Sequence, residues 1–156
     1  MKNILLITAF IVLCTKLFSQ LNCDQTLWPH VYHPERLQGE KKCISIKGTV
    51  RTIKAENDGG YSIQIRLDAG QPTTLLNDKN ISLQNACMVI EIICAHRPIE
   101  QADGLKSCGV FESKIKVPAV GDHVQVIGTY VLDTSAGHGW NAIYPVSEVI
   151  ELEKKR

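Results

Sequence analysis

The sequence has no clear excess of charge of either sign. The chain contains 17 Lys and Arg residues against 16 Asp and Glu residues. Without Lys2 and Lys16, which lie in an apolar N-terminal segment, the 17 basic residues become 15. Proteins that bind nucleic acid normally carry a marked excess of Lys and Arg. The composition therefore gives no electrostatic support for nucleic-acid binding.

Signatures of metal binding are also missing. The chain has no C-x-x-C pair and no histidine spacing that would complete a zinc site with its cysteines. His30 and His33 are three residues apart, but no third ligand lies near them in the sequence. We therefore expect no metal and no cofactor.

The N-terminus has the anatomy of a secretory signal peptide. Lys2 precedes an apolar run from Ile4 to Leu13, and the small Ser19 follows at a suitable cleavage position. The run is too short to span a bilayer, and no second apolar run is long enough. We expect a secreted or periplasmic protein with no transmembrane segment after processing; an uncleaved membrane anchor is the alternative.

The remaining chain is short enough to form one domain. Pro29 and Pro34 disfavour a regular helix near its start, so this arm is expected to be extended and packed across the domain. The predicted organisation is a signal peptide over residues 1–20, an N-terminal arm over 21–42, one domain over 43–152 and a charged tail over 153–156.

Five cysteines follow the predicted signal peptide: Cys23, Cys43, Cys87, Cys94 and Cys108. In an exported chain, disulfides are the default expectation. Cys94 and Cys108 bracket a compact polar segment, and closing a loop of about 15 residues stabilises a fold by about 3 kcal/mol. A Cys23–Cys43 bond would attach the arm to the domain. Cys87 is then left unpaired.

Alternating apolar and polar residues predict five β-strands. The first begins near Ile44, and the others cover about 61–67, 88–94, 124–130 and 141–152. The sequence ENDGG at 56–60 predicts a hairpin turn. Gly48 and Gly128 lie inside the first and fourth strands, where a barrel strand must coil sharply.

This pattern predicts an all-β fold, a small five-stranded Greek-key barrel of the OB type. Between the third and fourth strands we expect an insertion that is short helical or irregular and closed by the Cys94–Cys108 disulfide. Residues 75–85 between the second and third strands are expected to be helical or irregular. Another small barrel or sandwich is the alternative, because strand number alone does not fix topology.

Four segments give the chain a resemblance to a known group: CISIKGTVRTI, MVIEIICAH, VGDHVQVIGTYVLDTSAGHGW and IYPVSEVIEL. Together with residues 31–37 they resemble small exported bacterial and archaeal OB-fold-like proteins. The resemblance implies the fold and export, and no assigned enzymatic activity. Members tend to carry Glu and His two and four positions after the Trp, where this chain has Ala142 and Tyr144.

The segment GHGWNAIYP, residues 137–145, is the first candidate for a ligand site. On a strand, Trp140, Ala142 and Tyr144 would lie on one face, so the two aromatic rings would form a shelf around a small residue. The alternative is a packing role, with Trp140 closing the barrel and the His138 ring hydrogen-bonded to a turn carbonyl. The predicted contact residues are His138, Trp140, Tyr144 and Tyr130.

A second candidate surface is the face formed by the second and third strands, where OB barrels usually bind their ligands. Its exposed positions are predicted to include the cations Lys47, Arg51 and Arg66 and, from the third strand, Val89, Glu91 and Ile93. Glu91 is expected beside Arg66, where it would cancel part of the positive field. These strand positions contain no aromatic side chain, so base stacking of about 1–3 kcal/mol per base is missing.

These patterns favour an exported, non-catalytic binding or adaptor module for an oligosaccharide, a small ligand or a protein. The first alternative is a nucleic-acid-binding OB domain, which only the fold supports. The second is a metal-dependent hydrolase, but Asp68, Asp78 and Asp103 are scattered. His138 has no nucleophile or paired carboxylate near it in the sequence, and Asp133 is its candidate neighbour in space. Asn80-Ile81-Ser82 matches a glycosylation sequon, which we interpret as chance.

Overall fold

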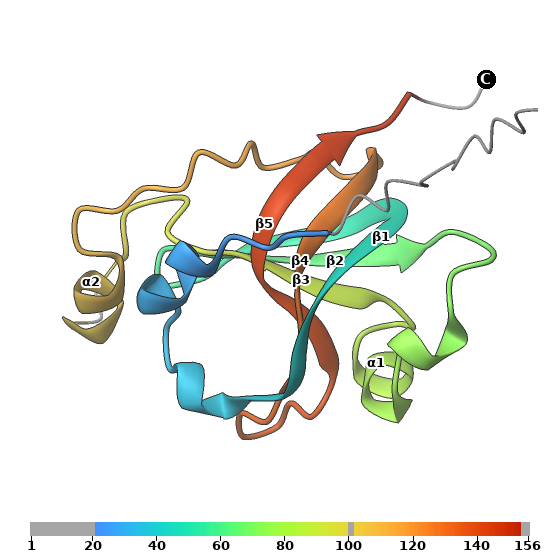
Figure 1. Cartoon of the computed structure of the whole chain (residues 1–156), viewed down its shortest axis with the longest axis horizontal. Helices are drawn as coiled ribbons and strands as arrows, with labels where there is room; N and C mark the ends of the chain where they lie inside the picture. Colours follow the sequence, from blue (N-terminus) through green and yellow to red (C-terminus); the bar gives the residue numbers. More distant parts are fainter. Residues whose placement is uncertain (1–20, 100–101, 154–156) are drawn as a thin grey trace, which may run out of the picture.

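A single five-stranded β-sheet dominates the protein, shown in Figure 1 as a computed structural model that describes residues 21–99 and 102–153. The strands are β1 (Leu37–Ala55), β2 (Tyr61–Leu67), β3 (Met88–Ile92), β4 (His123–Asp133) and β5 (Asn141–Glu151). The described residues also contain two α-helices, α1 (Asp78–Leu83) and α2 (Ala102–Cys108). Three 3-10 helices are η1 (Gln25–His30), η2 (Pro34–Arg36) and η3 (Thr73–Leu75). The predicted signal peptide lies outside the described residues, and no described helix could cross a membrane.

Every strand pairs with two neighbours. β1 pairs antiparallel with β2 and with β4, and the β2–β3 and β4–β5 pairs are also antiparallel. β3 and β5 run parallel, with Val89 opposite Ala142 and Ile90 opposite Ile143. The order β1-β2-β3-β5-β4 therefore leads back to β1. The predicted five strands and the hairpin between the first two are confirmed.

The N-terminal arm differs from the prediction. β1 begins at Leu37, seven residues before the predicted Ile44, and the arm forms the short turns η1 and η2 rather than an extended segment. Asp24 begins η1, and its side chain accepts a hydrogen bond from the Thr26 amide at 2.9 Å. Proline fixes φ near the value that a 3-10 turn requires, so Pro29 and Pro34 are compatible with these turns.

The main hydrophobic core lies on the inner face of the sheet. Alternation along β2 places Ile63 and Ile65 inside, with no exposed surface, while Gln64 and Arg66 point outward. Residues from the other four strands join them: Ile46, Val50, Met88, Ile90, Ile92, Val124, Val126, Ile143 and Val146.

A second apolar cluster covers the outer face of β3 and β5. Val89 and Ile93 pack there with Tyr144, under Leu27 and Val31 of the arm. The prediction that Val89 and Ile93 are exposed is therefore wrong. These two are only 2% and 6% exposed, because the arm and α2 form a second layer over them.

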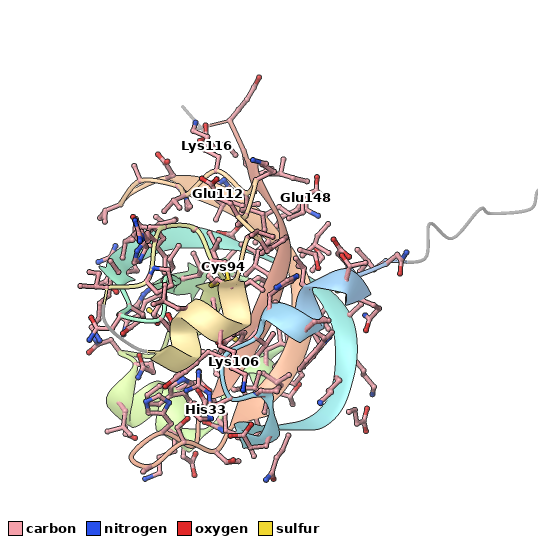
Figure 2. The ribbon with its side chains drawn as sticks, turned by 90° about the vertical axis from the view of Figure 1, so that its left-hand side faces the viewer. His33, Cys94, Lys106, Glu112, Lys116 and Glu148 are labelled. Atoms are coloured by element: carbon pink, nitrogen blue, oxygen red, sulfur yellow. A yellow bond between two sulfur atoms is a disulfide. The ribbon has the colours of Figure 1, made fainter. Side chains whose placement is uncertain are left out.

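Two disulfides hold this second layer in place. Cys23–Cys43 joins the arm to β1, and Cys94–Cys108 joins the segment after β3 to α2. Figure 2 views this side of the molecule, with α2 beside the arm and Cys94 next to the helix. Both predicted disulfides are confirmed, as is the unpaired Cys87, which is buried.

The two predicted insertions also contain helix. α1 precedes β3 and α2 precedes β4, and they lie on opposite sides of the molecule in Figure 1. The Cys94–Cys108 insertion is thus short helical, as expected.

The glycines inside β1 and β4 mark positions of close approach. A Cβ atom on Gly48 would lie 2.3 Å from the Arg66 carbonyl oxygen. A Cβ on Gly128 would lie 2.4 Å from Ile143 Cγ2 and 2.7 Å from the Pro145 oxygen. Neither glycine has a positive φ, so contact rather than backbone conformation excludes a side chain.

We predict that Gly128→Ala destabilises the protein by about 3 kcal/mol, because the new methyl group must displace β5 backbone. Gly70→Ala is the control, since its site has open space and only a positive φ of +88°. It should cost about 1 kcal/mol. Urea unfolding would measure both, and equal losses would contradict the close approach at Gly128.

Candidate functional site

A cleft of about 560 Å³ opens between the β1–β2 hairpin and the β4–β5 turn. Four regions contribute to its lining: Tyr32 and Arg36 of the arm; Thr52, residues 54–58, Ser62 and Gln64 of the hairpin; Gln84 and Glu91; and Asp133, His138 and Trp140 of the turn. It combines aromatic, amide, hydroxyl and charged groups, which is typical of a polar ligand site.

The β4–β5 turn presents two stacked rings to this cleft. The His138 and Trp140 ring centroids are 3.9 Å apart, with 24° between the planes. His138 Nδ1 lies 3.0 Å from Asp133 Oδ2. The predicted turn-carbonyl partner of His138 is therefore wrong, and the predicted neighbour Asp133 is confirmed. The carboxylate fixes the imidazole, and the imidazole lies against the indole.

Asp133 organises the whole turn. Its Oδ1 accepts hydrogen bonds from the Ser135 amide at 2.9 Å and the Ser135 hydroxyl at 2.7 Å. Burial alone would raise the pKa of Asp133, but these bonds, the His138 contact and the charge of Arg36 lower it below its ordinary value. Asp133 is thus a fixed negative charge under the turn. The Ser135 hydroxyl donates to Asp133 rather than to His138, so these residues form no nucleophile–base pair.

Two asparagines of the α1 region support the turn from behind. Asn77 Nδ2 donates to the Gly139 oxygen at 2.9 Å. Asn80 is fully buried, donates to the Asn141 and Cys87 oxygens at 2.9 and 3.1 Å, and accepts from the Asn141 amide at 2.9 Å. These hydrogen bonds fix the β4–β5 turn that carries the stacked His138 and Trp140 rings. Burial also makes the Asn80 amide inaccessible to glycosylation in the folded chain.

Arg36 and Glu91 lie together on one wall of the cleft. The Arg36 guanidinium lies 5.5 Å from the centre of the Tyr144 ring, and its Nε is 3.9 Å from Asp133 Oδ1. Its backbone oxygen accepts hydrogen bonds from the Thr134 amide and hydroxyl, at 3.0 and 2.8 Å. The arm is thereby fastened to the β4–β5 turn.

Glu91 is partly buried on β3, and burial raises its pKa to about 8. A hydrogen bond from Ser62 opposes this rise, the carboxylates of Asp58 and Glu56 add to it, and the charge of Arg36 opposes it. The Glu91 side chain is therefore mostly protonated and neutral at pH 7. The cation that influences it is Arg36, not Arg66 as predicted.

Two of the predicted aromatic contacts do not belong to the cleft. Tyr144 is 2% exposed under the arm, so Trp140 and Tyr144 form no open shelf. Tyr130 packs against the inner core, and its hydroxyl donates to the Leu75 oxygen at 3.1 Å. His138 and Trp140 are the two predicted aromatic contacts that line the cleft.

The three predicted groove cations also lie outside the cleft lining. Lys47 and Arg51 are exposed on β1, where Arg51 is the extra residue at an irregularity between Val50 and Thr52. Arg66 is exposed and donates to the Asn85 oxygen at 2.9 Å. The cleft therefore contains Arg36 and Lys54 instead of these cations.

Sequence reasoning missed Arg36, Asp58 and the supporting asparagines. One signal was present, because an Asn at the start of a helix with a polar partner three residues later is a capping pattern, formed here by Asn77 and Asn80. Arg36 carries no comparable local signal, since its neighbours in the cleft are distant in sequence. Within residues 21–99 and 102–153, no three His, Cys, Asp or Glu side chains are grouped to hold a metal ion.

We predict that Asn80→Ala costs about 3 kcal/mol, because several buried backbone groups lose their partners. The Trp140 fluorescence should also change as the turn loosens. Ser82→Ala is the control, since that side chain is exposed and makes one local bond to Asp78. Thermal and urea unfolding would measure the difference, and equal stability of the two variants would contradict the proposed support.

We predict that Glu91→Gln changes how stability depends on pH. The pKa of Glu91 rises from 4.5 to about 8 on folding, so the wild-type protein loses stability as the pH increases through this interval. The Gln variant has no such proton to lose. Its stability should therefore rise relative to wild type between about pH 4.5 and pH 8 and stay higher by a constant amount above pH 8, measured by urea unfolding at several pH values. Glu148→Gln, at an exposed β5 position, is the control, and parallel curves for wild type and Glu91→Gln would contradict the prediction.

Comparison with known proteins adds no counterpart for this site. No family model, no curated protein and no solved structure matches the chain. The site is therefore defined by its own geometry: a polar cleft with a stacked His138–Trp140 pair on one wall and Arg36 with Glu91 on another.

Proposed function

We propose that the protein is an exported, non-catalytic binding module on an OB-type Greek-key barrel, and that its cleft binds an oligosaccharide. The pairing order β1-β2-β3-β5-β4 supports this fold. OB barrels bind oligosaccharides and oligonucleotides on the face of strands two and three, between the loops that follow strands one and four. The lining of the cleft supports this assignment, because it includes residues 54–58 after the first strand and Asp133, His138 and Trp140 after the fourth.

The observation that carries the proposal is the pairing of a stacking surface with hydrogen-bonding side chains. The Trp140 indole, held by His138, offers a flat apolar face for the apolar face of a sugar ring. The amide of Gln64 and the carboxyl groups of Asp58 and Glu91 can bond to sugar hydroxyl groups. A polyhydroxylated ring matches both kinds of surface.

The charges of the cleft favour a sugar over a nucleic acid. Its fixed cations are Arg36 and Lys54, and Lys54 is paired with Glu56 at 2.9 Å. Asp58 and Asp133 add two carboxylates to the same cleft. A phosphate backbone requires an uncompensated positive groove, so this arrangement disfavours nucleic acid.

Export has its own support. Disulfides persist in oxidising compartments, and this chain contains two. Together with the predicted leader, they support a secreted or periplasmic location, where an oligosaccharide ligand would be available.

We predict that Trp140→Ala weakens oligosaccharide binding about tenfold, because a stacked ring contributes about 1 kcal/mol beyond its buried area. The disulfide-bonded protein would be screened by calorimetry against chitin, cellulose and xylan hexasaccharides and single-stranded oligonucleotides, at two ionic strengths. Trp140 fluorescence should shift with the sugar.

Tyr130→Phe is the matched control, because Tyr130 lies outside the cleft and should leave affinity unchanged. Tighter binding of oligonucleotides with a steep salt dependence would overturn the proposal in favour of a nucleic-acid module. Absence of binding to every sugar would also overturn it.

A further inference from the structure

The Arg36 guanidinium makes few bonds for a group with five N–H donors. One nitrogen, Nη2, lies 3.5 Å from the Tyr144 hydroxyl, at the limit of a hydrogen bond. Its Nε is fully shielded from solvent and has no hydrogen-bond partner. A buried donor without an acceptor lowers the stability of the folded protein, so such groups are rare in native structures.

The nearest carboxylate is not free to satisfy this donor. Asp133 Oδ1 is 3.9 Å from Arg36 Nε and already accepts two bonds from Ser135, while Oδ2 faces His138. Turning the carboxylate toward Arg36 would break the contacts that hold the β4–β5 turn. Nε itself is closed off by protein atoms, but the Arg36 side chain is 24% exposed and lines the cleft, so the terminal end of the guanidinium is the part that a ligand can reach.

At neutral pH Glu91 does not serve as a charged partner for the Arg36 guanidinium. Its pKa of about 8 keeps the carboxyl group mostly neutral, so it does not form a strong ion pair with Arg36. The groups that face it are Asp58 and Glu56 from the hairpin, Arg36 from the arm, and Tyr144 and Ser62. The negative charges of Asp58 and Glu56 disfavour ionisation of Glu91.

The same field restricts the acceptor that a ligand can bring. The cleft lining carries three carboxylates, Asp58, Glu56 and Asp133, against two cations, Arg36 and Lys54, so its net negative charge disfavours a ligand carboxylate, sulfate or phosphate. An uncharged oxygen, such as a sugar hydroxyl or an amide carbonyl, meets no such repulsion. The wall thus combines an unused donor with a field that disfavours anions.

We propose that Arg36 anchors the ligand by donating to an uncharged sugar oxygen, and that the surrounding carboxylates exclude acidic sugars. This inference rests on the proposed function, since it assumes that the cleft binds an oligosaccharide. It adds the residue that sets specificity and the class of sugar that is accepted.

A dependence on pH follows from the same geometry. Above pH 8 Glu91 becomes negative beside Arg36 and competes with the ligand for the guanidinium. The affinity for a neutral sugar should therefore fall as the pH rises from about 6.5 to 9. The Glu91→Gln protein should show no such fall.

The test compares Arg36→Lys with Arg51→Lys in the disulfide-bonded protein. Lysine retains the positive charge but not the planar fork of terminal N–H donors. Arg51 is exposed on β1 outside the cleft, so its variant is the matched control. Calorimetry at pH 7 would use chitin hexasaccharide, cellohexaose, xylohexaose and the acidic hexagalacturonate as probes.

We expect Arg36→Lys to weaken neutral-sugar binding at least tenfold, Arg51→Lys to leave it unchanged, and hexagalacturonate to bind at least tenfold more weakly than the best neutral probe. Equal affinities in the two lysine variants, or tighter binding of hexagalacturonate, would overturn the inference while leaving oligosaccharide binding intact. Should Arg36→Lys fail to fold, the pH series on wild type and Glu91→Gln decides, and identical profiles would overturn the inference. A wild-type protein that binds none of the probes would overturn the proposed function itself.

Discussion

The structure depends on a second layer held over the outer face of β3 and β5. The apolar run that forms β3 has side chains on both faces, and each face must be removed from water. The β-sheet buries the inner set, and the arm with α2 buries the outer set. The two disulfides fasten this layer, and each loop closure of this size contributes about 3 kcal/mol. Without the layer, Val89, Ile93 and Tyr144 would be exposed together.

The cleft lies where the N-terminal arm, part of the second layer, reaches the β4–β5 turn. The arm ends at η2, which brings Arg36 to the end of β4, where Thr134 of the β4–β5 turn donates hydrogen bonds to the Arg36 backbone oxygen. Asp133 then serves three neighbours at once: the Ser135 turn, the His138 ring and the charge of Arg36. The contacts that fasten the arm to the β4–β5 turn therefore also fix the positions of Arg36 and Asp133 in the cleft.

Much of the fold could be predicted from local patterns. The alternation of apolar and polar residues predicted β2 at the observed residues. The short loop between Cys94 and Cys108, together with the expected export, correctly predicted their disulfide. The site was only half predictable. His138 and Trp140 are neighbours in sequence, whereas Arg36, Asp58 and Glu91 meet only after the arm folds over the sheet. Tyr144 was misjudged for the same reason: strand alternation gives its face, but not what covers that face.

The two strand positions after Trp140 contribute packing rather than cleft surface. Ala142 and Tyr144 both lie in the second apolar cluster, 1% and 2% exposed. Burial raises the pKa of the Tyr144 phenol above its ordinary range, so the group stays protonated beside Arg36. The Tyr144 hydroxyl can therefore accept a hydrogen bond from Arg36, but it offers almost no surface to the cleft. The remaining polar groups can still donate and accept hydrogen bonds, which is sufficient for recognition.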